Sequence, residues 1–188
     1  MVRAKLEGKS EGQVKVRKFN AELLTEKVSA EDKGSARQLY DSGSYGEPKD
    51  GKIIYSFVEA LYLLEKNKLN LKEGRKSLKF KDLLSKARKA EPNIWLKYIV
   101  FRDMRSRGYV VKTALKFGAD FRIYDRGIKP GEDHAKWILY PVNEGSTLTW
   151  HEFSAKNRVA HSTRKRLLLG IVDSEEDVTY YEVKWTRP

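Results

Sequence analysis

Residues 116–137 read KFGADFRIYDRGIKPGEDHAKW and predict two strands with a loop between them. Residues 121–124 (FRIY) alternate apolar and polar side chains, as a half-buried strand does, and a second strand is predicted from Trp137. The loop, residues 127–133, contains two glycines and a proline, which are typical of exposed turns where functional groups are displayed. Tyr124 precedes this loop and His134 follows it, so a phenol and an imidazole lie at its two ends.

The residues around this stretch predict a C-terminal mixed sheet. Thr149 and Glu152 form a capping-box pattern, which predicts a helix that runs to about Ala160. An acidic turn from Asp173 to Asp177 separates the last two apolar stretches. The predicted strands are residues 109–113, 121–124, 137–140, 167–172 (fully buried) and 178–185 (half-buried).

The N-terminal half contains two predicted helices. Ser56 and Glu59 form a second capping-box pattern before the apolar run FVEALYLL (57–64). Apolar residues at 80, 83, 84 and 87 recur at helical spacing and predict another helix. Residues 1–50 are polar and predict only brief strands or loops.

The helical pattern breaks near Pro92, which suits the first turn of a third helix. Gly108 is suited to the end of that helix, and its predicted buried stripe is Trp95, Leu96, Ile99, Val100 and Met104. The expected fold class is therefore α+β, with a small N-terminal α+β domain (residues 1–91) and a C-terminal domain with a mixed sheet (residues 92–188).

Composition narrows the class of partner. Lys and Arg total 38 against 26 acidic residues, a net charge of +12 in 188 residues. Thermal adaptation enriches charges of both signs, so an excess of one sign favours a polyanionic partner such as a nucleic acid. The chain has no cysteine, which excludes disulfides and thiolate metal sites and favours a cytoplasmic protein. Its apolar runs are too short for a membrane span.

Three side chains have the chemistry for cutting RNA, which carries its own nucleophile, the 2′-hydroxyl. The reaction needs a base, an acid and a cation where charge collects on phosphorus. His134 suits proton transfer near neutrality, Tyr124 can act as a base where nearby cations favour its phenolate, and Lys165 can supply the cation. Arg122, Arg126 and Lys165 are candidates for the cations near the phenol. Taken alone, each of the three fits an ordinary surface or strand position, and Arg164 and Arg166 flank Lys165.

Long motifs in the chain resemble the archaeal tRNA-intron splicing endonucleases. They are RGYVVKTALKFGADFRIYDRG (107–127), then His134, then RVAHSTRKRLLLGIVD (158–173), and SFVEALYLL (56–64) is similar to the N-terminal domain of that family. The chain departs from the usual strings at Ala114, where the family has glycine, and at Thr163, where it has valine. The resemblance implies an N-terminal α+β domain followed by a C-terminal nuclease domain related to restriction-endonuclease folds.

The resemblance also implies an activity and the residues that perform it. Precursor tRNA would be cut at both splice sites of a bulge-helix-bulge motif without a metal or other cofactor. The products would be a 2′,3′-cyclic phosphate and a 5′-hydroxyl. Tyr124 matches the general base, His134 the general acid and Lys165 the lysine that steadies the phosphorane. Arg158 matches an arginine that stacks on a bulge base across a dimer, and Trp185 or Arg187 matches a second stacking partner.

The expected partners are precursor tRNA and further copies of the chain, as a homotetramer or a dimer of dimers. The resemblance implies that the acidic turn from Asp173 to Asp177 enters a basic groove of a neighbouring subunit and that the last strand pairs across a dimer axis. One alternative is a noncatalytic RNA-binding subunit of a heterotetramer. Another is a metal-dependent nuclease with ligands among Asp120, Glu132 and Asp133, together with Lys136. His151 is expected on a helix surface, and His161 is expected to support the turn before Lys165.

Overall fold

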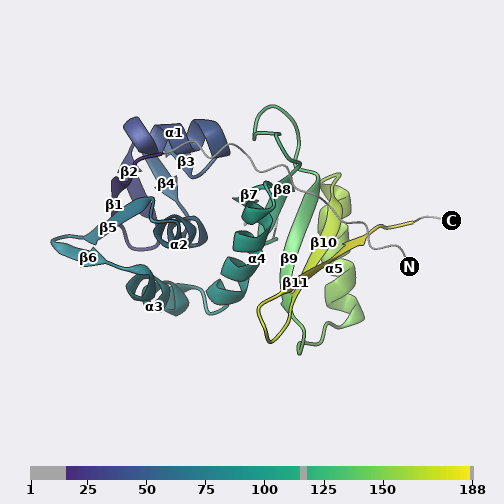
Figure 1. Cartoon of the computed structure of the whole chain (residues 1–188). Coiled ribbons are helices and arrows are strands. Elements are labelled where there is room, and N and C mark those ends of the chain that lie inside the picture. Colours follow the sequence, from purple (N-terminus) through teal and green to yellow (C-terminus); the bar gives the residue numbers. More distant parts are fainter. Residues whose placement is uncertain (1–15, 115–117, 187–188) are drawn as a thin grey trace.

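The first half of the chain forms a six-stranded sheet covered by helices in the computed structural model, which describes residues 16–114 and 118–186 (Figure 1). The strand order is β3-β4-β2-β1-β5-β6. β1 and β5 are parallel, and the other pairs are antiparallel. The elements are β1 (Phe19–Leu23), β2 (Val28–Glu31), α1 (Gly34–Gly43), β3 (Glu47–Lys49), β4 (Lys52–Tyr55), α2 (Phe57–Glu65), β5 (Leu69–Glu73), β6 (Lys76–Leu78) and α3 (Phe80–Ala90).

The second half forms a five-stranded sheet of order β11-β10-β9-β8-β7. β9 and β10 are parallel, whereas the other neighbours are antiparallel. The predicted mixed sheet and α+β class are thereby confirmed. The elements are α4 (Ile94–Ser106), β7 (Val110–Thr113), β8 (Phe121–Tyr124), β9 (Trp137–Asn143), α5 (Trp150–Ser162), β10 (Arg166–Val172) and β11 (Val178–Val183).

Both predicted capping boxes form. The Ser56 side chain accepts from the Glu59 backbone N–H, and the Glu59 carboxylate accepts from the Ser56 backbone N–H at the start of α2. Thr149 and Glu152 make the same reciprocal pair at the start of α5. Gly108 has φ +85° after the last turn of α4, a left-handed conformation that favours glycine. These helix ends are local features, so the sequence specifies them directly.

Two expectations from the sequence need correction. Trp95 and Leu96 are only partly buried, whereas Ile94, Tyr98 and Phe101 are almost fully buried on α4. The buried face of α4 is therefore rotated relative to the predicted one, because α4 packs between α2 on one side and the second sheet on the other. Residues 19–55 also form four strands and helix α1 rather than isolated strands or loops.

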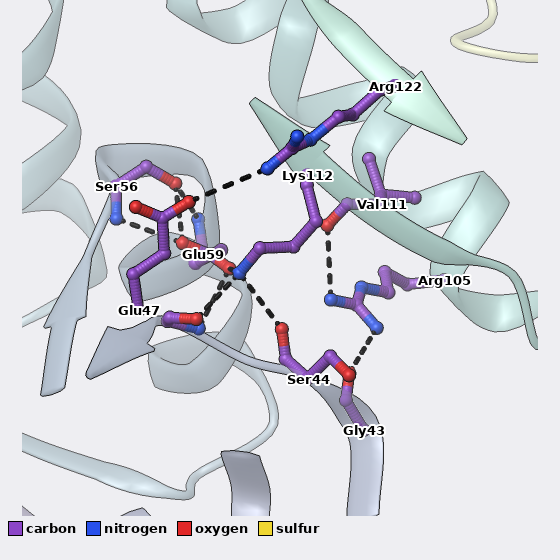
Figure 2. Close-up of polar contacts among 10 residues, drawn as sticks. Gly43, Ser44, Glu47, Ser56, Glu59, Arg105, Val111, Lys112 and Arg122 are labelled. Atoms are coloured by element: carbon purple, nitrogen blue, oxygen red, sulfur yellow. Dashed lines mark hydrogen bonds and ion pairs between the residues drawn. The ribbon is translucent and has the colours of Figure 1, made fainter. Parts of the chain in front are cut away.

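One continuous apolar core joins the two sheets, because a single cluster of buried side chains includes residues of both. A buried polar contact accompanies it (Figure 2). Lys112 on β7 reaches across to the first half, where its Nζ donates to the carbonyl oxygens of Ser44 and Gly46 at 3.1 and 2.6 Å. It lies 3.5 Å from Glu59 Oε1. Arg105 on α4 donates to the Gly43 carbonyl oxygen at 2.7 Å.

The charge on Glu59 is held by its partners. Burial by itself raises the pKa of a carboxyl, but the Lys112 ammonium and the backbone N–H groups of Gly46 and Ser56 outweigh burial and lower the pKa of Glu59 below its ordinary value. Glu59 therefore caps α2 and also neutralises a lysine from the second sheet.

No helix in the described part of the chain is both long enough and apolar enough to cross a membrane.

Candidate active site

The three candidate residues lie at one end of the central strands of the second sheet. Tyr124 is the last residue of β8, His134 lies three residues before β9, and Lys165 directly precedes β10. Because β8 runs antiparallel to β9, and β9 runs parallel to β10, the end of β8 lies beside the starts of β9 and β10. The three side chains line one pocket of about 360 Å³, together with Arg122 and residues 131–133 and 135.

Tyr124 forms an inner wall of this pocket. It is only 5% exposed and packs against Val110 and Ala135. The guanidinium carbon of Arg122 lies 6.0 Å from the centre of the Tyr124 ring. The phenol is therefore held rigidly beside a permanent positive charge.

His134 is exposed at the end of a tightly folded loop. Its backbone N–H donates to the Asp133 carboxylate at 2.6 Å, and Gly127 and Gly131 have positive φ angles of 76° and 100°. The base of the loop is closed by the 2.7 Å ion pair between Lys136 and Asp125. The hydrogen bond from Lys136 lowers the pKa of the Asp125 carboxyl. The ion pair therefore holds the two ends of the loop together, and His134 lies exposed at one of them.

Lys165 follows a tight turn at the end of α5. Arg164 has φ +55°, its N–H donates to the His161 carbonyl oxygen at 2.9 Å, and the Lys165 N–H donates to the Ala160 carbonyl oxygen at 2.8 Å. Lys165 Nζ donates to the Thr163 carbonyl oxygen at 2.9 Å. This turn orients Lys165 toward the pocket, whereas its neighbours Arg164 and Arg166 do not line it.

The residues expected to stack on RNA bases lie near the end of α5. Arg158 is exposed on α5, one turn before His161. Trp185 is 56% exposed, and its ring centre lies 4.7 Å from that of His161. Arg187 lies outside the described residues. The exposed indole of Trp185 therefore lies beside the helix that carries Arg158.

Arg122 lines the pocket, although the sequence suggested it only as a cation near the phenol. Side chains alternate along β8, so Arg122 and Tyr124 lie on the same face. This spacing of two residues is the feature of the sequence that could have predicted Arg122 in the pocket wall. Figure 2 shows the guanidinium directed toward Glu47 of the first sheet, 3.9 Å from its carboxylate. The first half of the chain therefore contacts a residue of the pocket wall.

The residues considered for a metal site do not form a common cluster. Asp120 pairs with Lys97 at 3.1 Å and Lys136 pairs with Asp125, whereas Glu132 and Asp133 line the pocket. Across residues 16–114 and 118–186, no three His, Asp or Glu side chains gather in a way that could hold a metal ion.

Comparison with known protein families identifies the class of this chain. Residues 94–180 match the model of the tRNA intron endonuclease catalytic C-terminal domain, and residues 19–84 match that of the tRNA intron endonuclease N-terminal domain. The chain belongs to the tRNA intron endonuclease family.

Similar proteins from archaea carry the name tRNA-splicing endonuclease. The protein from Thermococcus onnurineus is 37% identical over 165 residues, which cover 88% of this chain and 95% of that protein. The protein from Pyrococcus furiosus is 38% identical, with coverage of 88% and 95%. The protein from Methanothermobacter thermautotrophicus is 37% identical over 171 residues, 91% of this chain and 99% of that protein.

Proposed function

We propose that this chain is the catalytic subunit of a tRNA-splicing endonuclease that cuts both splice sites of a bulge-helix-bulge motif in precursor tRNA. The observation that carries the proposal is the pocket itself. A phenol, an imidazole and an ammonium from three separate segments line it. The pocket lies within the part of the chain that matches the catalytic domain of the family. Residues 92–188 form the catalytic domain and residues 1–91 the N-terminal domain.

The proposed reaction uses the 2′-hydroxyl of the RNA as the nucleophile. Tyr124 accepts the 2′-hydroxyl proton while the 2′-oxygen forms a bond to phosphorus. The bond from phosphorus to the 5′-oxygen breaks, and His134 protonates that leaving oxygen. Lys165 stabilises the negative charge on the phosphorane. The products are a 2′,3′-cyclic phosphate and a 5′-hydroxyl, and the three side chains supply these roles without a metal.

A bulge gives the RNA the geometry that this attack requires. In a regular helix the 2′-oxygen, phosphorus and 5′-oxygen are not in line, whereas an unstacked bulge nucleotide can be rotated into line and clamped. Arg158 and Trp185 are the proposed clamps, because a guanidinium and an exposed indole both stack on bases. Arg187 is the alternative to Trp185.

A symmetric assembly matches a substrate with two cleavage sites. The proposed assembly is a homotetramer or dimer of dimers, with the acidic turn from Asp173 to Asp177 at a subunit interface. The edge position of β11 and its exposed Tyr181 support pairing of this strand with another copy.

Cleavage in the presence of EDTA tests the proposal. An end-labelled bulge-helix-bulge RNA should be cut within its bulges and leave cyclic phosphate and 5′-hydroxyl ends, because no step needs a metal. Cleavage that stops in EDTA and returns with Mg²⁺ would contradict the metal-free mechanism. Tight binding without any cleavage would instead favour a noncatalytic subunit of a mixed tetramer.

The stacking role of Trp185 predicts a binding defect. Trp185→Ala should weaken binding of bulge-containing RNA by about 5- to 150-fold, because stacking on an aromatic ring contributes about 1–3 kcal/mol per base. Equilibrium binding to RNAs with and without the bulges measures the effect. Trp150→Ala is the matched control, since Trp150 is 84% exposed at the start of α5. Equal losses for both RNAs would mean that Trp185 does not recognise the bulge.

A further inference from the structure

Helix α3 and the hairpin formed by β5 and β6 hold a large share of the positive charge of the chain. Residues 69–90, here called the basic hairpin-helix, contain eight of the 38 Lys and Arg residues and two of the 26 acidic residues. Half of the net charge of +12 therefore lies within these 22 residues.

Both acidic residues of this unit already have partners. Glu73 pairs with Lys86 at 2.9 Å, and the Asp82 carboxylate accepts from the backbone N–H of Lys79 at 2.8 Å. Within the described part of the chain, seven exposed cations of the unit form no ion pair. They are Lys72, Arg75, Lys76, Lys79, Lys81, Arg88 and Lys89.

The backbone that carries these cations is fixed by the core. Leu71 faces Leu78 across the hairpin, and both are buried, as are Leu83 and Ala87 of α3. Lys81 and Lys89 are eight residues apart on the exposed side of α3, and this spacing aligns them on one helical face. The charges are therefore displayed on ordered elements of the fold.

Two of the cations lie where they do not favour the stability of the free protein. Lys79 is the N-cap residue of α3 and Lys81 lies in its first turn, where the positive end of the helix dipole disfavours a cation. Like charges close together also repel one another. A bound polyanion would relieve both effects.

The unit lies far from the candidate active site. β6 is an edge strand of the first sheet, and Figure 1 shows the hairpin projecting from the end of the molecule opposite β9, β10 and α5. A ligand that reaches both regions must be long as well as polyanionic. RNA beyond the cleaved motif has both properties.

We propose that the basic hairpin-helix is a second RNA-binding surface, which holds the phosphate backbone of the precursor outside the bulge-helix-bulge motif. This inference rests on the proposed function for its substrate. The surface contributes affinity through counterion release and does not select sequence.

An acidic turn from another copy of the chain is a weaker candidate for this surface. In that turn, Glu176 accepts a hydrogen bond from the Trp95 indole at 3.1 Å and lies 3.5 Å from Arg102 of its own chain. Part of its charge is therefore already neutralised within its own chain, which favours RNA as the occupant.

The test compares two charge-neutralising variants on two RNAs. The first variant carries Lys72→Gln, Arg75→Gln and Lys76→Gln in the hairpin. The matched control carries Lys27→Gln, Lys49→Gln and Lys52→Gln, which remove the same charge from exposed positions around β2, β3 and β4 of the same sheet. The RNAs are a full-length precursor tRNA and a short RNA that contains only the bulge-helix-bulge motif. Binding is measured from low to high salt, and cleavage of the bound RNA is measured in a single turnover.

The hairpin variant should bind the full-length precursor about tenfold more weakly at physiological salt, with a salt dependence reduced by up to about three ion equivalents, because three cations are removed. It should bind the short RNA within twofold of the unchanged protein and cleave either bound RNA at the unchanged rate. The control variant should resemble the unchanged protein on both RNAs.

Three results would overturn the second surface: equal losses for the two variants, equal losses for the two RNAs, or unchanged binding. A hairpin variant that loses subunits in sedimentation but keeps its RNA affinity would assign the surface to a protein contact instead. If the unchanged protein cuts neither RNA, the proposed function fails. The difference in binding between the two RNAs still decides the second surface in that case.

Discussion

Replacing His134 by alanine should abolish cleavage while binding of precursor RNA stays within a few-fold. General acid catalysis contributes about 10²- to 10⁴-fold to the rate, and protonation of the 5′-oxygen would have no substitute in the pocket. The His134 side chain is exposed, so its loss should leave the fold intact. Single-turnover cleavage and equilibrium binding, measured on the same RNA, separate the two effects.

His151→Ala provides the matched control, because His151 is an exposed residue in the first turn of α5. It should cleave at the normal rate. Added imidazole should partly restore cleavage by His134→Ala, since its protonated form in solution can deliver the missing proton. A variant that loses binding together with cleavage, and that imidazole does not rescue, would show that His134 has a structural role.

Replacing Lys112 by methionine should lower the free energy of unfolding by about 3–5 kcal/mol, the usual cost of breaking a buried ion pair. The Lys112 and Glu59 side chains are only 5% and 7% exposed. Without Lys112, the Glu59 charge and two carbonyl oxygens lose a partner in the core. For a chain of this size the melting temperature should fall by roughly 6–20 °C, measured at fixed protein concentration beside the exposed control Lys52→Met.

The loss of unfolding free energy caused by Lys112→Met should become smaller as the pH is lowered. The pKa of Glu59 is lowered in the folded protein, so its ionised form stabilises the fold above the pKa of an unfolded glutamate. That stabilisation is lost as the pH falls through the lower pKa that Glu59 has in the folded protein. The difference between the two proteins should therefore be full near neutral pH and should shrink in acid below about pH 4. A difference that stays constant down to acid pH would show that the Glu59 charge does not contribute.

The sequence predicted features that neighbouring residues determine. Ser56 with Glu59, and Thr149 with Glu152, specify the starts of α2 and α5 through side chains three residues away. Strand β8 has its predicted bounds, because its apolar residues alternate with polar ones. Helix α1 was missed, since its N-cap residue, Lys33, makes no side-chain cap.

The first sheet could not be predicted in the same way. β1 pairs with β5, fifty residues later, and all three residues of β3 are exposed, so neither strand has a strong local pattern. Lys112 and Arg105 are buried, although their charges suggest surface positions; their partners lie on distant segments. For the site, the sequence and its resemblance nominated Tyr124, His134 and Lys165, whose roles stay predictions. Only the topology of the second sheet shows why they share a pocket.

The continuous core beneath the two sheets has a consequence for motion. Buried side chains of α2 and α4 belong to the same cluster as Phe121 and Ile123 of β8, the strand that ends at Tyr124. The first half of the chain cannot separate from the second without exposing these side chains to water. Local opening near the pocket is therefore linked to global unfolding. Strand β8 should be among the slowest parts of the molecule to exchange its amide hydrogens, although the loop that carries His134 is exposed to solvent.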